Sequence, residues 1–353
     1  MKTGISLVEL ARTIEANAAG KKDFIAVANR ATMQVVDGKP LIEIEDHGAF
    51  PLQALPLRQI ATYADVPAKY FDRMLAEAPD LAAINVNAWL RRKPDAEKRM
   101  VRTMHGNGRA WLSNGYQRIE NDRIANVTLP VLAEFPGIQV KSTNITESRM
   151  YIQAVVPSLE AEVRSRDGRR VGDLMQAGVV IQNSEVGLGA VDVLELDWRL
   201  RCLNGMVGES LYRRAHVGRK VDDTEALWAD DTRKADDDAL MLKVRDMVRA
   251  ALDGARFRAR VEKMSGLAGA ALASPVKAVE VLDQVLPVTQ GDKDGILKSL
   301  VEGGDLSGWG LLNAVTHQAH AAASYDRSVE FEAMGGKLLN LPAGEWKRLL
   351  EAA

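Results

Sequence analysis

The most unusual polar spacing in the chain lies between Gly178 and Gly208, a stretch that also holds the single cysteine, Cys202. A cysteine nucleophile needs a neighbouring base, and His216 and Asn204 are the local candidates. The cysteine alternates with arginines along a predicted strand, in the segment RLRCLNG. Because alternate residues of a strand face opposite sides, we predict that the thiol faces the core and serves packing rather than catalysis.

Two histidines offer a second kind of chemistry. His317 and His320 lie three positions apart on a predicted helix, and a metal site there would need a third ligand such as Asp326 or Glu330. A polar helix face explains the same spacing. The sequence contains no His-Glu-x-x-His, Cys-x-x-Cys or phosphate-loop motif. We therefore expect no metal, no cofactor and no assigned catalytic residue.

Clustered arginines indicate contact with phosphates instead. Four of them, Arg164, Arg166, Arg169 and Arg170, flank an Asp-Gly turn, and guanidinium groups at such a turn can bind phosphate oxygens through paired N–H donors. The alternative is a solvated, solubilising loop. We expect these arginines to contribute to ligand binding while leaving the fold almost untouched.

A second basic stretch runs from Trp89 to Arg123, with nine basic and four acidic side chains. Its aromatic residues include Trp89, Trp111 and Tyr116, on which unpaired bases could stack. The alternative is that the rings belong to the core. The full set of predicted nucleic-acid contacts is Arg91, Arg92, Lys93, Arg102, Arg109, Trp111, Tyr116, Arg164, Arg166, Arg169, Arg170, Arg199, Arg201, Arg213 and Arg214.

Several motifs occur in an order that resembles a known family, domain of unknown function 932, also described as phage/plasmid-like protein. They are WLSNGY at 111–116 with Asn-Asp at 121–122, NSEVGLGAV at 183–191, RLRCLNGMVG at 199–208 and WGLLNAVT at 309–316. The resemblance covers roughly residues 50 to 340. It implies a phage or plasmid setting but no established activity. Many members carry His-Asp-Gly where this chain has Glu-Val-Gly at 185–187, so no role of that histidine is transferred.

Composition limits the class of protein. The 353 residues are 46% hydrophobic and 27% charged, with a net charge of −2 and one cysteine. These values are typical of a soluble globular protein in a reducing compartment. No apolar run has the length of a secretory or membrane-spanning segment. We therefore expect a cytoplasmic protein with no membrane partner.

The elements that must position these residues are predicted from periodicity and turn signals. We expect an α+β fold with a central, mostly antiparallel β-rich core, flanking helices and a helical C-terminal region. The predicted division is an α+β core domain at 1–221 and a helical region at 222–353 packed on it. Expected helices are 6–18, 57–63, 67–78, 81–92, 121–134, 222–264, 276–286, 294–302, 308–324 and 345–352, and expected strands include 24–36 and 41–45, with a β-rich region from 148 to 217.

Two turns carry further expectations. Asp37-Gly38 is a hairpin signal, and Asn204-Gly205 predicts a left-handed or type I′-like turn. We also expect Arg199, Arg201, Arg213 and Arg214 to form one positive surface on neighbouring strands. The acidic segment 222–238, with eight acidic and two basic residues, suits a homo-oligomer in which it meets a neighbour's basic surface.

The sequence thus favours a nucleic-acid-binding protein of phage or plasmid DNA metabolism, with single-stranded DNA binding or annealing as the most specific form. Three alternatives stay open. A protein-binding accessory or anti-defence factor needs no nucleic-acid chemistry. The pair of short helices at 57–78 has helix-turn-helix proportions, although two packed helices without a DNA-reading role have the same pattern. An enzyme would have to use Glu185, Cys202, His216 or His317.

Overall fold

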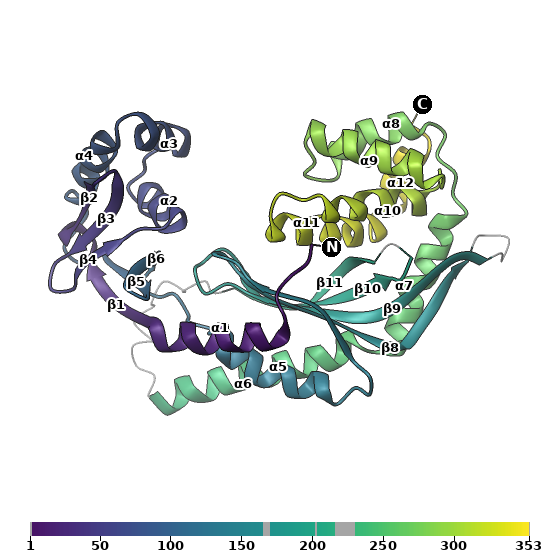
Figure 1. The fold of residues 1–353 in the computed structure, drawn as a ribbon, viewed down its shortest axis with the longest axis horizontal. Coiled ribbons are helices and arrows are strands. Elements are labelled where there is room, and N and C mark those ends of the chain that lie inside the picture. Colours follow the sequence, from purple (N-terminus) through teal and green to yellow (C-terminus); the bar gives the residue numbers. More distant parts are fainter. Residues whose placement is uncertain (1, 165–169, 202, 216–229, 353) are drawn as a thin grey trace.

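Three antiparallel sheets and a large helical region make up the fold, which confirms the predicted α+β class (Figure 1). The computed structural model describes residues 2–164, 170–201, 203–215 and 230–352. The predicted domain division at 221 falls outside these residues.

The first two sheets belong to the N-terminal part of the chain. One has the order β1-β5-β6 and the other β2-β3-β4. Their bounds are β1 Lys21–Val27, β2 Ala31–Val36, β3 Lys39–Ile44, β4 Gly48–Pro51, β5 Lys98–Met104 and β6 Asn107–Ser113. The expected strand 24–36 is thus divided by a short 3₁₀ turn, Ala28–Arg30. Asp37 and Gly38 both have positive φ between β2 and β3, which confirms the hairpin turn.

Three helices pack on these sheets, namely α2 Ala54–Tyr63, α3 Ala68–Glu77 and α4 Pro79–Leu90. They share one apolar core with the β2-β3-β4 sheet, and Phe71, Val86 and Trp111 are buried within it. Pro79 occupies the start of α4, where a missing N–H costs nothing. Both helices of the predicted helix-turn-helix pair are therefore part of this packed unit.

The third sheet has five strands that follow one another in the order β11-β10-β9-β8-β7. They are β7 Gln139–Ile145, β8 Met150–Arg164, β9 Arg170–Asn183, β10 Ala190–Arg199 and β11 Asn204–Ala215. Alternation along β10 gives the sheet two buried faces. Val191 and Val193 belong to a core shared with helices, whereas Leu196 and Trp198 pack with a separate group of strand residues.

Helices cover both faces of this sheet (Figure 1). The core that holds Ile152 of β8 also contains Leu10 of α1, Ile124 of α5 and Val244 of α6, so it joins segments from both predicted domains. The helices outside the N-terminal unit are α1 Leu7–Gly20, α5 Asn121–Ala133, α6 Asp230–Ala251, α7 Gly254–Ala268, α8 Pro275–Glu280, α9 Gln290–Gly303, α10 Gly308–His317, α11 Tyr325–Leu339 and α12 Ala343–Leu350.

The prediction of a turn at Asn204-Gly205 is wrong. Both residues are already in β11, opposite Arg199 and Trp198 of β10, and among the described residues of this connection it is Leu203 that has a positive φ. Gly205 is needed for space instead, since a Cβ there would lie 2.7 Å from a methyl carbon of the buried Leu196.

The single positive surface predicted on β10 and β11 is also wrong. Arg199 is paired with the first residue of β11, whereas Arg213 and Arg214 are paired with Asp192 and Val191 at the other end of the same ladder. Antiparallel pairing over this length separates the two groups by roughly 25–30 Å at the usual rise of a strand.

Candidate functional site

A cluster of charged side chains forms where the N-terminal unit meets the five-stranded sheet. Its central residue is Glu185, a buried carboxylate in the loop after β9. Glu185 accepts hydrogen bonds from Lys21 Nζ at 2.5 Å, from Arg109 Nη1 at 2.9 Å and from the backbone N–H of Asn121 at 2.7 Å. One carboxylate therefore connects β1, β6 and the start of α5.

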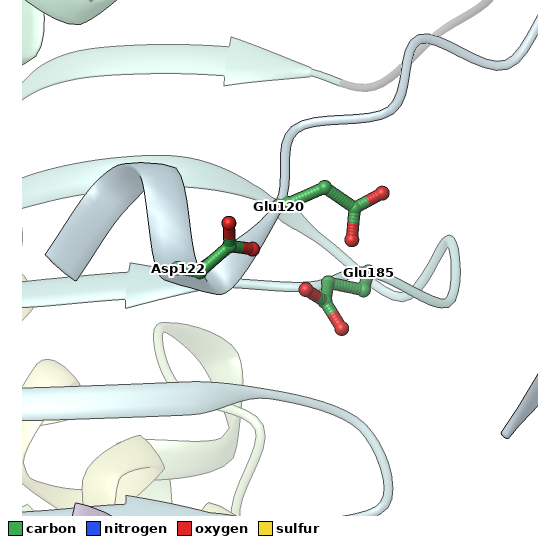
Figure 2. Close-up of side chains that lie close together, drawn as sticks. All are labelled: Glu120, Asp122 and Glu185. Atoms are coloured by element: carbon green, nitrogen blue, oxygen red, sulfur yellow. The ribbon is translucent and has the colours of Figure 1, made fainter. Parts of the chain in front are cut away.

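Three carboxylates surround the ammonium group of Lys21. Its Nζ lies 2.8 Å from Glu120, 3.9 Å from Asp122 and 2.5 Å from Glu185. Figure 2 shows Glu120 just before α5, Asp122 on the first turn of that helix and Glu185 on the loop after β9, with the three carboxylates near one another. One oxygen from each of the three carboxylates lies within 4.8 Å of the other two, a spacing that suits a hard divalent cation.

Arg102 of β5 is the most deeply buried cation of the cluster, with 0% of its surface exposed. It binds both oxygens of Asp23 at 3.1 and 3.0 Å, donates to the backbone oxygen of Glu185 at 2.7 Å and contacts Glu120. Such forked, charge-assisted bonds satisfy a guanidinium group that has no access to water.

These contacts fix the charge states. Burial alone raises the pKa of Glu120, but the charge of Arg102 and the charge and hydrogen bond of Lys21 outweigh burial and hold the pKa at about 2. Burial likewise disfavours the charged form of Arg102, and Glu120 and Asp23 more than compensate, so its pKa is raised. Glu120 and Arg102 therefore form an ion pair at neutral pH.

We call this cluster the clamp, because its ion pairs hold separate elements together. Its members are Lys21, Asp23, Arg102, Arg109, Glu120 and Glu185. The Lys21 ammonium occupies the centre of the only three-carboxylate group with metal-ligand spacing among the described residues. A metal ion would have to displace it. The protonated lysine is also no nucleophile, because its lone pair is used. The arrangement joins two sheets and α5 through buried charge.

Two of the motifs that carry the family resemblance meet at this clamp. Tyr116 donates its hydroxyl to the backbone oxygen of Ser184, and Asn183 donates to the backbone of Ile119 and to Asn121. The sequence did not indicate Lys21, Asp23 or Glu120 as members. Their partners lie 18 to 164 residues away, so no local spacing reveals them.

Four predicted nucleic-acid contacts belong to the interior, and for them the prediction is wrong. Arg102, Arg109, Trp111 and Tyr116 are all buried. The two arginines are neutralised by carboxylates of the clamp, and the Trp111 ring packs in the N-terminal core near Tyr63. A base can stack only on an exposed ring face, so neither aromatic residue provides one.

The basic residues at the end of α4 lie at the surface. Arg91 and Arg92 are exposed, and Lys93 is partly buried with its Nζ 4.6 Å from the Tyr63 ring. Trp89, also part of the predicted basic stretch, is 50% exposed. The guanidinium carbon of Arg92 lies 5.7 Å from the centre of its ring, a cation–π distance.

The other predicted arginines are dispersed. Arg164 is exposed at the end of β8, and Arg201 is exposed in the β10–β11 connection. Arg199 binds both oxygens of Asp173, and Arg213 and Arg214 are exposed near the end of β11. Arg166 and Arg169 lie outside the described residues, and of Arg170 only the backbone is described.

The histidine pair has the expected proximity, with ring centres 5.2 Å apart. His317 ends α10 and contacts Ser299, while His320 lies in a 3₁₀ turn. Of the third ligands considered, Asp326 accepts bonds from Thr146, Ser148 and Tyr151, and Glu330 pairs with Arg327. Both carboxylates therefore have partners other than the two histidines. Cys202 and His216 lie outside the described residues.

Comparison with known proteins adds no family or activity: no family model, curated protein or solved structure matches this chain. Among the described residues, no helix has both the length and the apolar character needed to cross a membrane.

Proposed function

We propose that the protein binds nucleic acid, with single-stranded DNA as the preferred ligand, and that the end of α4 is the principal contact. The observation that carries this proposal is the half-exposed Trp89 ring beside Arg92 and Arg91. An exposed ring gives an unpaired base a stacking partner, and adjacent guanidinium groups bind the phosphates on either side of it.

Four of the predicted contacts are buried, which reduces the number of residues that can bind the nucleic acid. With Arg102, Arg109, Trp111 and Tyr116 in the interior, the ligand would be held by few residues on the N-terminal unit. The exposed Arg164, Arg201, Arg213 and Arg214 are secondary contacts in this proposal, because they lie on other elements. A role in phage or plasmid DNA metabolism, including annealing by a homo-oligomer, rests on the family resemblance.

The test is a salt-dependent gel shift with single-stranded and double-stranded DNA. Each phosphate contact contributes a slope of about −0.7 in log K against log salt for single strands. Replacing Arg91 and Arg92 together by Ser should flatten the slope by about 1.4 if each makes one contact. Trp89→Ala should weaken binding by about 1–3 kcal/mol without changing the slope to the same degree.

Arg73→Ser is the matched control, because Arg73 is an exposed arginine on the neighbouring α3. Its affinity for single strands should equal that of the unaltered protein. An affinity for single strands that does not change with salt concentration would contradict the proposal. Equal affinities of the Trp89→Ala and Arg73→Ser variants would contradict it as well.

One observation favours a protein partner instead. Two apolar residues earlier in α4, Leu81 and Ile84, are exposed, and 63% of the surface of Ile84 is accessible. Their spacing of three residues places them on one helix face, and exposed apolar stripes are typical of helix-mediated protein contacts. If DNA binding fails while a Leu81→Ser, Ile84→Ser variant loses a partner recovered by the unaltered chain, this second function is preferred.

A further inference from the structure

A pocket far from the clamp lies where the segment before α1 passes over the edge of the five-stranded sheet. Its volume is about 610 Å³, and its lining comes from residues 2–7, β7, Trp198 of β10, Leu203 and His320. Pockets of this size accommodate small organic molecules. The N-terminal segment is held in place by a bridge between Ile5 and Thr143 of β7.

The polar lining favours an anion. Lys2, Lys141 and His320 all line the pocket, and among its described lining residues none is Asp or Glu. Lys2 Nζ donates to the backbone oxygens of Ala322 and Ala323, and Lys141 Nζ donates to a neighbouring glutamine. Since an ammonium group has three N–H donors, both lysines retain a donor for a ligand.

Trp198 provides a second, independent indication. It lines the pocket while only 3% of its surface is exposed, and its Nε1–H has no hydrogen-bond partner. A buried donor without a partner is unfavourable, and an acceptor oxygen of a ligand would satisfy it. Lys141 Nζ lies 5.7 Å from the centre of the same ring, so the ammonium group and the indole ring are neighbours at the pocket.

Apolar residues also line the pocket. They are Ile5, Leu7, Val140 and Leu203. A simple inorganic anion would leave this surface unused, whereas a ligand with a flat apolar part would cover it and gain from its burial.

From these features we infer that the pocket binds a small organic anion, one in which a phosphate or a similar oxyanion is joined to a flat apolar group. The oxyanion is held by Lys141 and Lys2 with the indole N–H of Trp198 as a further donor. This site is separate from the end of α4, so it stands or falls without the nucleic-acid proposal.

Isothermal titration calorimetry with three probes tests the inference on the full chain without DNA. The probes are 1-naphthyl phosphate, the neutral 1-naphthol and inorganic phosphate. We expect 1-naphthyl phosphate to bind one-to-one and at least about tenfold more tightly than the other two, since losing one charge-assisted hydrogen bond typically costs that factor.

Two variants locate the site. Lys141→Ala should weaken 1-naphthyl phosphate roughly tenfold, and Trp198→Phe, which keeps a ring but removes the N–H, should weaken it severalfold. Lys277→Ala is the control, an exposed lysine of α8, and should bind like the unaltered protein. Melting temperatures of all three variants establish that each is folded.

Three outcomes would overturn the inference. The first is absence of heat with 1-naphthyl phosphate at millimolar concentration. The second is equal affinity for 1-naphthol, which would leave only an apolar groove. The third is equal binding by the folded Lys141→Ala and Lys277→Ala variants, which would place the anion elsewhere on the surface.

Discussion

Arginines of the clamp and arginines at the end of α4 come from the same basic stretch of sequence but have different environments in the fold. Arg102 and Arg109 are buried and bound to carboxylates, whereas Arg91 and Arg92 are exposed beside a half-exposed tryptophan. Counting charge along the chain treats all four alike. What separates them is whether the fold brings an acid to the guanidinium group, and that decides whether the charge stabilises the protein or is available to a ligand.

The largest effect should come from breaking the clamp. Glu185→Ala would remove the carboxylate bound to the buried Arg109 and one of the three carboxylates around Lys21, and removing one member of a buried ion pair typically costs about 3–5 kcal/mol. Urea unfolding measures the loss. Glu302→Ala, a change to an exposed residue of α9, is the control and should stay within about 0.5 kcal/mol. Equal stability of the two variants would show that the clamp contributes nothing.

Acid should weaken the clamp next. The pKa of Glu120 is lowered from 4.5 to about 2 in the folded protein, so this group binds protons more readily when the chain is unfolded. Its contribution is complete above about pH 4.5 and is lost as the pH falls toward 2. The free energy of unfolding measured between pH 6 and pH 2 should therefore fall less steeply in Glu120→Gln. Glu15→Gln, at an exposed position of α1, should keep the original slope.

The smallest effect on stability is expected at the end of α4. Replacing Arg91 and Arg92 by Ser should change the free energy of unfolding by no more than about 0.5 kcal/mol each, because both side chains are exposed. The same variant is expected to lose affinity for single strands. Thermal melting together with the gel shift gives both values, and a strongly destabilised variant would erase the distinction between the two sets of arginines.

The fold was predictable wherever local signals sufficed. Asp37-Gly38 closed the expected hairpin, and the antiparallel sheets followed from alternating apolar residues. Helix α11 was missed. It contains Gly335 and Gly336 and a fully buried Glu332, none of which resembles an amphipathic pattern. Gly336 is there for close approach, since a Cβ would lie 1.9 Å from the backbone oxygen of Val207 in β11.

The candidate site was less predictable than the fold. The unusual polar spacing of its loop indicates Glu185, but its partner Lys21 lies 164 residues earlier in the chain. Trp89 and Trp111 are both tryptophans in one basic stretch, yet one is half exposed and the other is buried. Their difference depends on the packing of α4 and β6, which no local pattern encodes.

Contacts between the two ends of the chain have a consequence for the order of folding. The backbone N–H of Lys2 donates to Ser328 of α11, and Gln153 of β8 donates to Glu332, 179 residues later. A ribosome makes roughly 5–20 residues per second, so the five-stranded sheet is complete well before α11 has been synthesised. Until then Trp198, Leu196 and their neighbours lack the helix that packs along β11. Because of this late contact, we expect chains truncated before α11 to aggregate.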